Sequence, residues 1–445
     1  MIEDHKAHTQ RPTNVRWLVF ASACLTSWFL YLHRYSWAIA KGDIKAEFGL
    51  TDTELGWLDS AFLFGYAIFQ IPTGHLGDVF GPALVLPIFI IGWSICVAGT
   101  GLGGGFWGFA GVRSLFGVAQ AGTYPNLGTV TKSWFPASIR TTIQGAIASL
   151  SGRAGGACAA LLVAGLLMGE MGMSWRWAFV VIGLAGTLFA VAFRFVYRDR
   201  PEDHPWVNEA ERRLIRGDDN QKEQPVGRIA ITGDRRARTS FGCFLLSQFT
   251  SAAGDSLFVY WLFLFLEEAK GLDKTTMGIY ASLPLIGGAI GGFAGGALND
   301  IMTRWTSRRV ARSLIGFSGK LISAALIVAS TFVEDGRLVM VVLAVAKFFT
   351  DWSQPTSWGT ATDIAGKASG KIFGGLNMCG NIGAFIAGPV FGSIKGNFGW
   401  DPLFWTVAGI FTVSALCWPA VDCTKPIVVD KEPASTTSGH SEAER

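Results

Sequence analysis

The chain has 445 residues, of which 50% are hydrophobic and only 16% are charged, and its formal net charge is +4. Soluble domains carry about 25% charged residues, so this composition excludes an ordinary soluble protein and indicates an integral membrane protein. The seven cysteines form no C-x-x-C pair, which argues against a disulfide framework or a metal site.

Hydrophobic runs in chain order predict an all-α membrane protein with twelve transmembrane helices, because a spanning helix needs about 20 apolar residues. The expected spans cover residues 17–40, 54–73, 82–101, 106–131, 140–168, 177–197, 240–266, 275–298, 312–333, 338–362, 372–394 and 401–421. They form two six-helix bundles at 17–197 and 239–422, a cytoplasmic linker at 198–238, and cytoplasmic tails at 1–16 and 423–445.

Basic residues gather in alternate loops of this arrangement. Arginines crowd the linker and the loop after the eighth span, whereas opposite loops carry acidic pairs such as Glu267-Glu268. The positive-inside rule then places both termini and the linker in the cytoplasm. We expect a monomeric, multi-pass protein of the plasma (inner) membrane.

The fourth span carries an unusual charge and a helix breaker. Arg113 stands inside an apolar run, small residues follow it, and Pro125 comes before the polar exit at Lys132. A charge in a spanning helix is costly unless it faces protein or water, and proline permits a kink. We expect a bent, tightly packed helix that aims Arg113 inward, as a structural or gating residue.

The two halves share a short pattern. Gly74 to Asp78 follows the second span and Gly296 to Asp300 follows the eighth, and both read G-x-L-x-D. The same pattern at the same place in each half suggests two parallel six-helix repeats.

The layout, the G-x-L-x-D loops and the Arg113…Gly117 pattern resemble the major facilitator superfamily, from about residue 17 to 421. The chain is most similar to its anion:cation symporter branch, which includes hexuronate and galactonate transporters and sialin. The matching pieces, in order, are Tyr31-x-x-Arg34, Ala121-Gly-Thr-Tyr-Pro125, Trp134-Phe-Pro136, Ser174-Trp-Arg-Trp-Ala-Phe179, Trp261 to Leu266, Trp358 to Asp363, and Asn377…Asn381.

The resemblance implies a major facilitator fold and a secondary transporter of a small organic anion. In that branch the arginine that Arg34 matches contacts the substrate carboxylate, for which a guanidinium fork is well suited. Arg153 matches a polar position that lines the same site, although it could instead pair with a buried carboxylate. We expect a monocarboxylate with hydroxyls, such as a sugar acid, with further substrate contacts from Tyr31, Gln120, Ser357, Trp358 and Asn377.

Coupling is where the chain departs from that branch. His33 and Gln120 stand where members carry carboxylates. Histidine titrates near neutrality, so we expect proton symport through His33, with Asp255 and Asp351 as further candidates for a proton or sodium site. Asp255 could also answer Lys347 across the bundle. A passive uniporter or an exchanger is the alternative.

Further charged residues complete the expected set. Asp78 is kept without the basic residues that the family places after it, whereas Asp300 and Arg304 are both present as a cytoplasmic latch. Lys347 and Asp351 are four residues apart, so they share a helix face and can pair. Lys320 either snorkels or faces the interior.

No enzyme, cofactor, metal or nucleic-acid signature stands out. Gly103-x-Gly105-x-x-Gly108 matches a dinucleotide pattern in spacing only, because no strand precedes it. The expected partners are the organic anion, a proton or sodium, and the lipid bilayer. Other functions that we weighed are an organic phosphate exchanger, which would place a second arginine in the seventh span, and a membrane sensor without transport.

Overall fold

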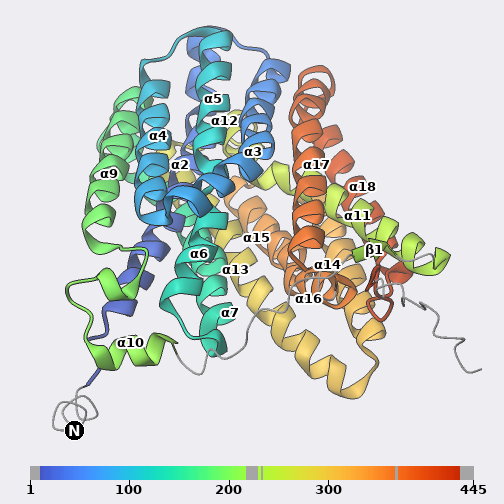
Figure 1. The fold of residues 1–445 in the computed structure, drawn as a ribbon. Helices are drawn as coiled ribbons and strands as arrows, with labels where there is room; N and C mark the ends of the chain where they lie inside the picture. The colour runs from blue at the N-terminus through green and yellow to red at the C-terminus, as the bar shows by residue number, and fades with distance from the viewer. Residues whose placement is uncertain (1–10, 217–228, 232–233, 366–368, 431–445) are drawn as a thin grey trace, which may run out of the picture.

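The computed structural model describes residues 11–216, 229–231, 234–365 and 369–430, and Figure 1 shows a bundle of long, roughly parallel helices. Helices cover all twelve predicted ranges. Eight helical stretches in the described residues are long and apolar enough to cross a membrane. The all-α membrane fold is therefore confirmed, and the count of twelve spans and the domain bounds stay predictions.

The N-terminal half begins with the longest helix of the chain and ends at the linker. Its helical segments are α2 (Val15–Phe48), α3 (Asp52–Phe80), α4 (Pro82–Leu102), α5 (Gly105–Ala121), α6 (Thr123–Trp134), α7 (Ala137–Gly145), η1 (Ala146–Ser151), α8 (Gly152–Ala159), η2 (Ala160–Glu170) and α9 (Trp175–Val196).

The C-terminal half repeats this order. Its helical segments are α11 (Arg235–Ser256), η4 (Leu257–Trp261), α12 (Leu262–Glu268), α13 (Lys274–Trp305), α14 (Arg308–Ser330), α15 (Gly336–Trp352), α16 (Gln354–Ala365), α17 (Ser369–Phe398), α18 (Trp400–Cys417) and η6 (Trp418–Ala420). Both G-x-L-x-D motifs lie in the last turns of helices, α3 and α13, and not in loops as expected.

Proline explains why the predicted fourth and tenth spans are each broken in two. Pro125 has no N–H to donate to the carbonyl of Ala121, and α5 ends at Ala121. Pro355 likewise cannot bond to the carbonyl of Asp351, and α15 ends one residue later. The predicted bend in the fourth span is present, and its counterpart in the other half places Asp351 at the equivalent break.

The described part of the linker contains a short helix and a short strand. Its helix α10 (Glu209–Arg216) carries Glu211, which accepts hydrogen bonds of 3.0 Å from the backbone N–H groups of Val15 and Arg16. A carboxylate at this position satisfies free N–H groups at the start of α2. The strand β1 (Ile229–Ile231) pairs antiparallel with β2 (Val428–Asp430) after the last helix. The predicted tails at residues 1–10 and 431–445 lie outside the described residues.

The two halves meet through glycines. Helices α3 and α17 lie side by side (Figure 1). A methyl group built on Gly56 would lie 2.1 Å from the carbonyl oxygen of Gly388, and one on Gly278 would lie 2.5 Å from the backbone nitrogen of Gly165. Only glycine permits such close backbone approach, so α3–α17 and η2–α13 form two tight seams between the halves.

Candidate functional site

Arg34 lies in the middle of α2, and among the described residues Gln120 is the side chain to which its guanidinium donates hydrogen bonds. Its Nε and Nη2 donate to Oε1 of Gln120 at 3.3 and 3.1 Å. The guanidinium carbon also lies 4.8 to 5.2 Å from the ring centroids of Phe62, Tyr66 and Tyr31. No carboxylate among the described residues pairs with Arg34. It is therefore a positioned cation that can accept an anion.

Gln120 fixes the direction of that guanidinium. Its side-chain amide nitrogen donates to the carbonyl of Leu30 at 3.1 Å, which leaves its oxygen to face Arg34. The predicted contact residues Arg34, Gln120 and Tyr31 are thus brought together. Phe62 and Tyr66, on α3, were missed, since an aromatic residue in a spanning helix usually packs in the core and gives no separate signal.

A second charged group joins the two halves. Nζ of Lys347 donates to Asp351 at 2.9 Å and also contacts Asp255. Asp351 also forms an ion pair of 3.0 Å with Arg153 of α8, in the other half. The predicted pairing of Lys347 with Asp351 is confirmed, and Asp255 does answer Lys347. Arg153 therefore pairs with a buried carboxylate, which was the alternative to a substrate contact at this position.

This group lies where the helices are irregular. Asp255 stands one residue before the end of α11, where the π-helical turn η4 begins, and Asp351 stands just before the end of α15. Irregular backbone at membrane depth is tolerated where it is buried in protein or lines water. The side chains of Asp255 and Arg153 are 32% and 27% exposed, so this part of the group is not fully buried by protein.

Lys320 adds a cation beside this group. We call the group (Arg153, Asp255, Lys347 and Asp351), together with Lys320 and Arg34, the charged layer. Lys320 is buried, and its Nζ donates to the hydroxyl of Ser251 at 2.7 Å and to the carbonyl of Thr350, beside Asp351, at 3.0 Å. The snorkelling alternative for Lys320 does not describe this geometry, because its ammonium is held inside the bundle.

His33 points away from Arg34. It is 1% exposed, its Nε2 lies 3.0 Å from the carbonyl of Ile182 in α9, and its Nδ1 has no hydrogen-bond partner. Neighbouring residues on a helix differ by about 100° in direction, so His33 and Arg34 face different neighbours.

The other three predicted contact residues are spread along α16 and α17. Ser357 is buried and accepts from Gln248 at 3.4 Å, whereas Trp358 is 53% exposed. The side-chain amide of Asn377 donates to Gln70 of α3 at 3.3 Å, so it bridges the halves. The described hydrogen bonds join none of these three residues to Arg34.

A third buried group lies close to Arg34. Nζ of Lys41 lies 2.6 Å from Asp59, whose other oxygen accepts from Trp37 at 2.8 Å and lies 3.9 Å from Arg113. The Arg113 guanidinium carbon is 5.3 Å from the ring centroid of Phe62, the ring that Arg34 also covers. Arg113 points inward as predicted, but its partner Asp59, and Lys41, which shares that carboxylate, were missed.

The group also reaches across the halves. Nζ of Lys41 donates to the carbonyl of Tyr260 at 3.1 Å and lies 3.8 Å from the centroid of Trp261. A signal for this group was present, because Asp59 stands inside a predicted span, where a charge is costly.

Ion pairs close one end of the bundle, which we call the far end because it is opposite the linker and the described chain ends. Lys45 contacts Asp52 and Glu268 at 2.7 Å each, and Lys395 contacts the same carboxylates at 2.8 and 2.6 Å. Lys274 pairs with Asp43 and Glu267, at 2.8 Å each. Each of these lysines binds carboxylates of both halves.

The predicted latch residues lie at the other end. Asp78, Asp300 and Arg304 are exposed, and none of them forms an ion pair with another described residue. Ion pairs between the halves are thus concentrated at the far end.

Comparison with known proteins decides the family. Residues 20–387, and an overlapping stretch at 246–443, match the Major Facilitator Superfamily. The chain belongs to this superfamily. The probable sulfoacetate transporter SauU of Cupriavidus necator is 30% identical over 408 residues, covering 90% of this chain and 92% of that protein. The probable galactarate/D-glucarate transporter GudP of Bacillus subtilis is 30% identical over 408 residues, covering 86% of each chain.

A solved structure agrees in fold. The crystal structure of a bacterial homolog to the human lysosomal transporter Spinster superimposes with a TM-score of 0.73 at 17% identity, covering 92% of this chain and 95% of that one. As a member of the major facilitator superfamily, the chain is a multi-pass secondary transporter and not an enzyme.

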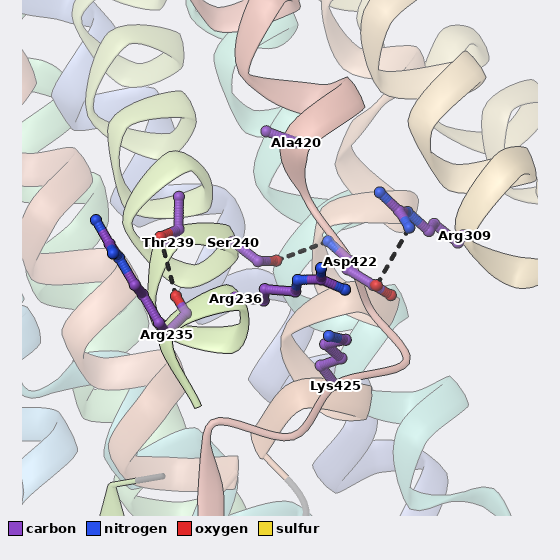
Figure 2. Close-up of a pocket in the computed structure, with 8 residues that line it drawn as sticks. All are labelled: Arg235, Arg236, Thr239, Ser240, Arg309, Ala420, Asp422 and Lys425. Atoms are coloured by element: carbon purple, nitrogen blue, oxygen red, sulfur yellow. Dashed lines mark hydrogen bonds and ion pairs between the residues drawn. The ribbon is translucent and has the colours of Figure 1, made fainter. Parts of the chain in front are cut away.

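This major facilitator chain also has a basic pocket apart from the charged layer. The pocket has a volume of about 510 Å³. Figure 2 shows Arg236, Arg309 and Lys425 around Asp422. Asp422 lies 3.4 Å from Arg309, and its N–H donates to Ser240 at 2.6 Å. All lining residues belong to the C-terminal half, so this pocket ties the ends of three helices and does not lie between the halves.

Proposed function

We propose that the chain carries a small organic anion across the membrane by alternating access, with the substrate carboxylate on Arg34. The observation that carries this proposal is the guanidinium itself, which is oriented by Gln120 and three aromatic rings and has no carboxylate partner among the described residues. An arginine fork binds a carboxylate through two hydrogen bonds and stays charged. Any anion that binds there replaces water and gains a charge-assisted contact.

The substrate class follows from chemistry and from the relatives. The matched transporters are named for sulfoacetate and for galactarate and D-glucarate, which are small organic anions. We propose a sugar acid or a related hydroxy-carboxylate, with hydroxyl contacts from Tyr31, Ser357 and Asn377 and a stacking surface from Trp358. An organic phosphate exchanger is the alternative.

The direct test is uptake by the purified full chain in liposomes. Radiolabelled D-gluconate and D-glucarate should enter protein-loaded vesicles faster than empty ones, and unlabelled sugar acids should compete. Uptake of glycerol 3-phosphate with no uptake of either sugar acid would favour the phosphate exchanger.

We propose that the termini and linker face the cytoplasm and that the two bundles, residues 17–197 and 239–422, rock against each other in the plasma (inner) membrane. The arginine-rich linker supports this orientation. The far end is then external and closed by its ion pairs, while Asp78, Asp300 and Arg304 lie at the cytoplasmic end.

Lys395→Gln is expected to open the far end, because it removes the ion pair with Asp52 of the other half and a second one with Glu268, which itself pairs with Lys45 of the other half. The reporter is Ser60→Cys, at a buried site where the native hydroxyl donates to the carbonyl of Phe385 of α17. A membrane-impermeant maleimide applied to intact cells should label it several-fold faster in the Lys395→Gln background.

The matched control is Arg337→Gln, which removes an exposed cation at the same end that has no ion pair with another described residue. Equal labelling in both backgrounds would show that the ion pairs do not hold the halves together. Faster labelling only in inside-out vesicles would reverse the orientation.

We propose proton-coupled symport, and the geometry favours Asp255 and Asp351 over His33 as the proton-carrying groups. The carboxylates contact Lys347 and, through Asp351, Arg153 of the other half, so protonation would weaken a contact between the moving parts. A proton on Nδ1 of His33 would lie buried without a partner, which is costly.

Asp255→Asn is therefore expected to abolish accumulation under an inward proton gradient while exchange of labelled for unlabelled substrate continues. His33→Asn, the matched change on the other candidate, should retain more than half of the accumulation. Both are measured in liposomes with and without an ionophore. The opposite pattern would restore His33 as the coupling group, and wild-type equilibration without accumulation would indicate a uniporter or exchanger.

A further inference from the structure

The charged layer between the halves is not electrically balanced. The contacts described above link five of its members, and Arg34 lies beside Tyr31 without a described direct contact to them. Four of the six members are cations and two are carboxylates. They are the cations Arg34, Arg153, Lys320 and Lys347 and the carboxylates Asp255 and Asp351. The layer thus holds two positive charges in excess, and the adjoining group of Lys41, Arg113 and Asp59 adds a third.

Excess charge at membrane depth needs a counter-charge. A buried ion without compensation is strongly unfavourable, and charged residues inside spanning segments usually pair or mark a substrate path. A monocarboxylate would balance one of the two excess charges in the layer, and a coupled proton would add one back. A dianion would balance both.

The layer also offers two separate places for negative groups. Arg34 has no carboxylate partner among the described residues, and Arg153 has one that it can release. Asp351 is held by Lys347 at 2.9 Å as well as by Arg153 at 3.0 Å. If Arg153 turned to a substrate, Asp351 would still have its lysine, so the exchange would leave no carboxylate unpaired.

Tyr31 lies between Arg34 and the part of the α8 backbone that carries Arg153. Its ring centroid is 5.1 Å from the Arg34 guanidinium carbon. A methyl group built on Gly152, next to Arg153 in the chain, would lie 2.7 Å from the same ring. One arginine comes from α2 and the other from α8, so a short substrate lying along Tyr31 could reach both.

We propose that the substrate carries two separate anionic groups, one bound by Arg34 and the other by Arg153 in place of Asp351. This rests on the proposed function and narrows its substrate class from the expected monocarboxylate to a small dicarboxylate or sulfo-carboxylate. The branch that the sequence resembles includes galactonate carriers, which move a monoanion, so family membership alone does not decide the number of charges. The excess positive charge and the second arginine, Arg153, favour a substrate with two negative charges.

The test uses two probes that differ at one end only. D-Glucarate is D-gluconate with its terminal CH2OH replaced by a carboxylate, so a ratio of their affinities isolates the second charge. Affinities are measured by thermal shift and by uptake competition with the full chain in detergent and in liposomes. We expect wild-type protein to bind D-glucarate at least tenfold more tightly than D-gluconate.

Arg153→Gln should reduce that preference to less than threefold, mainly by weakening D-glucarate binding. Arg153→Lys keeps the charge and should retain an intermediate preference, and it serves if the glutamine variant does not fold. Arg34→Lys should weaken both probes, and Arg337→Gln, at an exposed site, should change neither.

Several results would overturn the proposal. D-Gluconate could bind as tightly as D-glucarate, or Arg153→Gln could weaken the binding of both probes equally. Either result would indicate that the protein transports a monoanion. Tighter binding of glycerol 3-phosphate than of D-glucarate would indicate one doubly charged group instead of two. Binding of none of these probes to folded protein would instead overturn the proposed function itself.

Discussion

Arg34→Lys is expected to lower substrate affinity about 10- to 100-fold while the protein stays folded. Lysine keeps the positive charge but replaces a planar fork with a single ammonium. The lost contact is a hydrogen bond to a charged group, which contributes roughly 1.5–3 kcal/mol, and each 1.4 kcal/mol is about tenfold in affinity. The ammonium also cannot stack flat on the rings of Phe62 and Tyr66 while it bonds Gln120.

The measurement is the concentration dependence of uptake in liposomes, with thermal unfolding of the same sample as the check of folding. Arg337→Lys is the matched control, because it makes the same change at an exposed site and should leave uptake as in wild type. Normal uptake by an Arg34→Ala variant would remove Arg34 from the site and with it the basis of the proposed function.

The largest loss of stability is expected for Asp59→Asn. The carboxylate of Asp59 is 1% exposed and lies between the cations of Lys41 and Arg113. Removing its charge leaves both cations buried without a counter-ion, and breaking a buried pair in this way costs about 3–5 kcal/mol. The group also contacts Tyr260 of the other half, so the loss should spread across both bundles.

Lys41→Met should cost less, because Asp59 keeps Arg113 and the indole N–H of Trp37. The two losses of stability are compared by thermal unfolding followed by size-exclusion chromatography. The control is Asp401→Asn, which changes an exposed carboxylate at the start of α18. A wild-type unfolding temperature for Asp59→Asn would show that Asp59 does not neutralise these cations.

Local features of the chain were predictable from residue order. Long apolar runs located the helices, because length and hydropathy alone decide whether a segment can lie in a bilayer. Pro125 located a helix break, because its missing N–H acts within one turn. The Lys347–Asp351 pair followed from the helical repeat, which places residues four apart on one face.

The pairing of charges between helices depended on the tertiary structure. Arg153 meets Asp351, Lys41 meets Asp59, and Glu268 at the end of α12 meets Lys395, although each partner belongs to another helix. Sequence shows that a buried charge needs a partner, but several candidates exist for each. Only helix packing selects one, because it sets which faces lie within about 4 Å.

His33 and Arg34 show most clearly which features follow from the sequence and which depend on the tertiary structure. Their order in the chain determines that they point about 100° apart on one helix, so they cannot both face one ligand in the same way. Which of them faces Gln120, and which packs against α9, is decided by how α2 is rotated among its neighbours. That rotation minimises the free energy of the whole bundle, and no single helix carries the information.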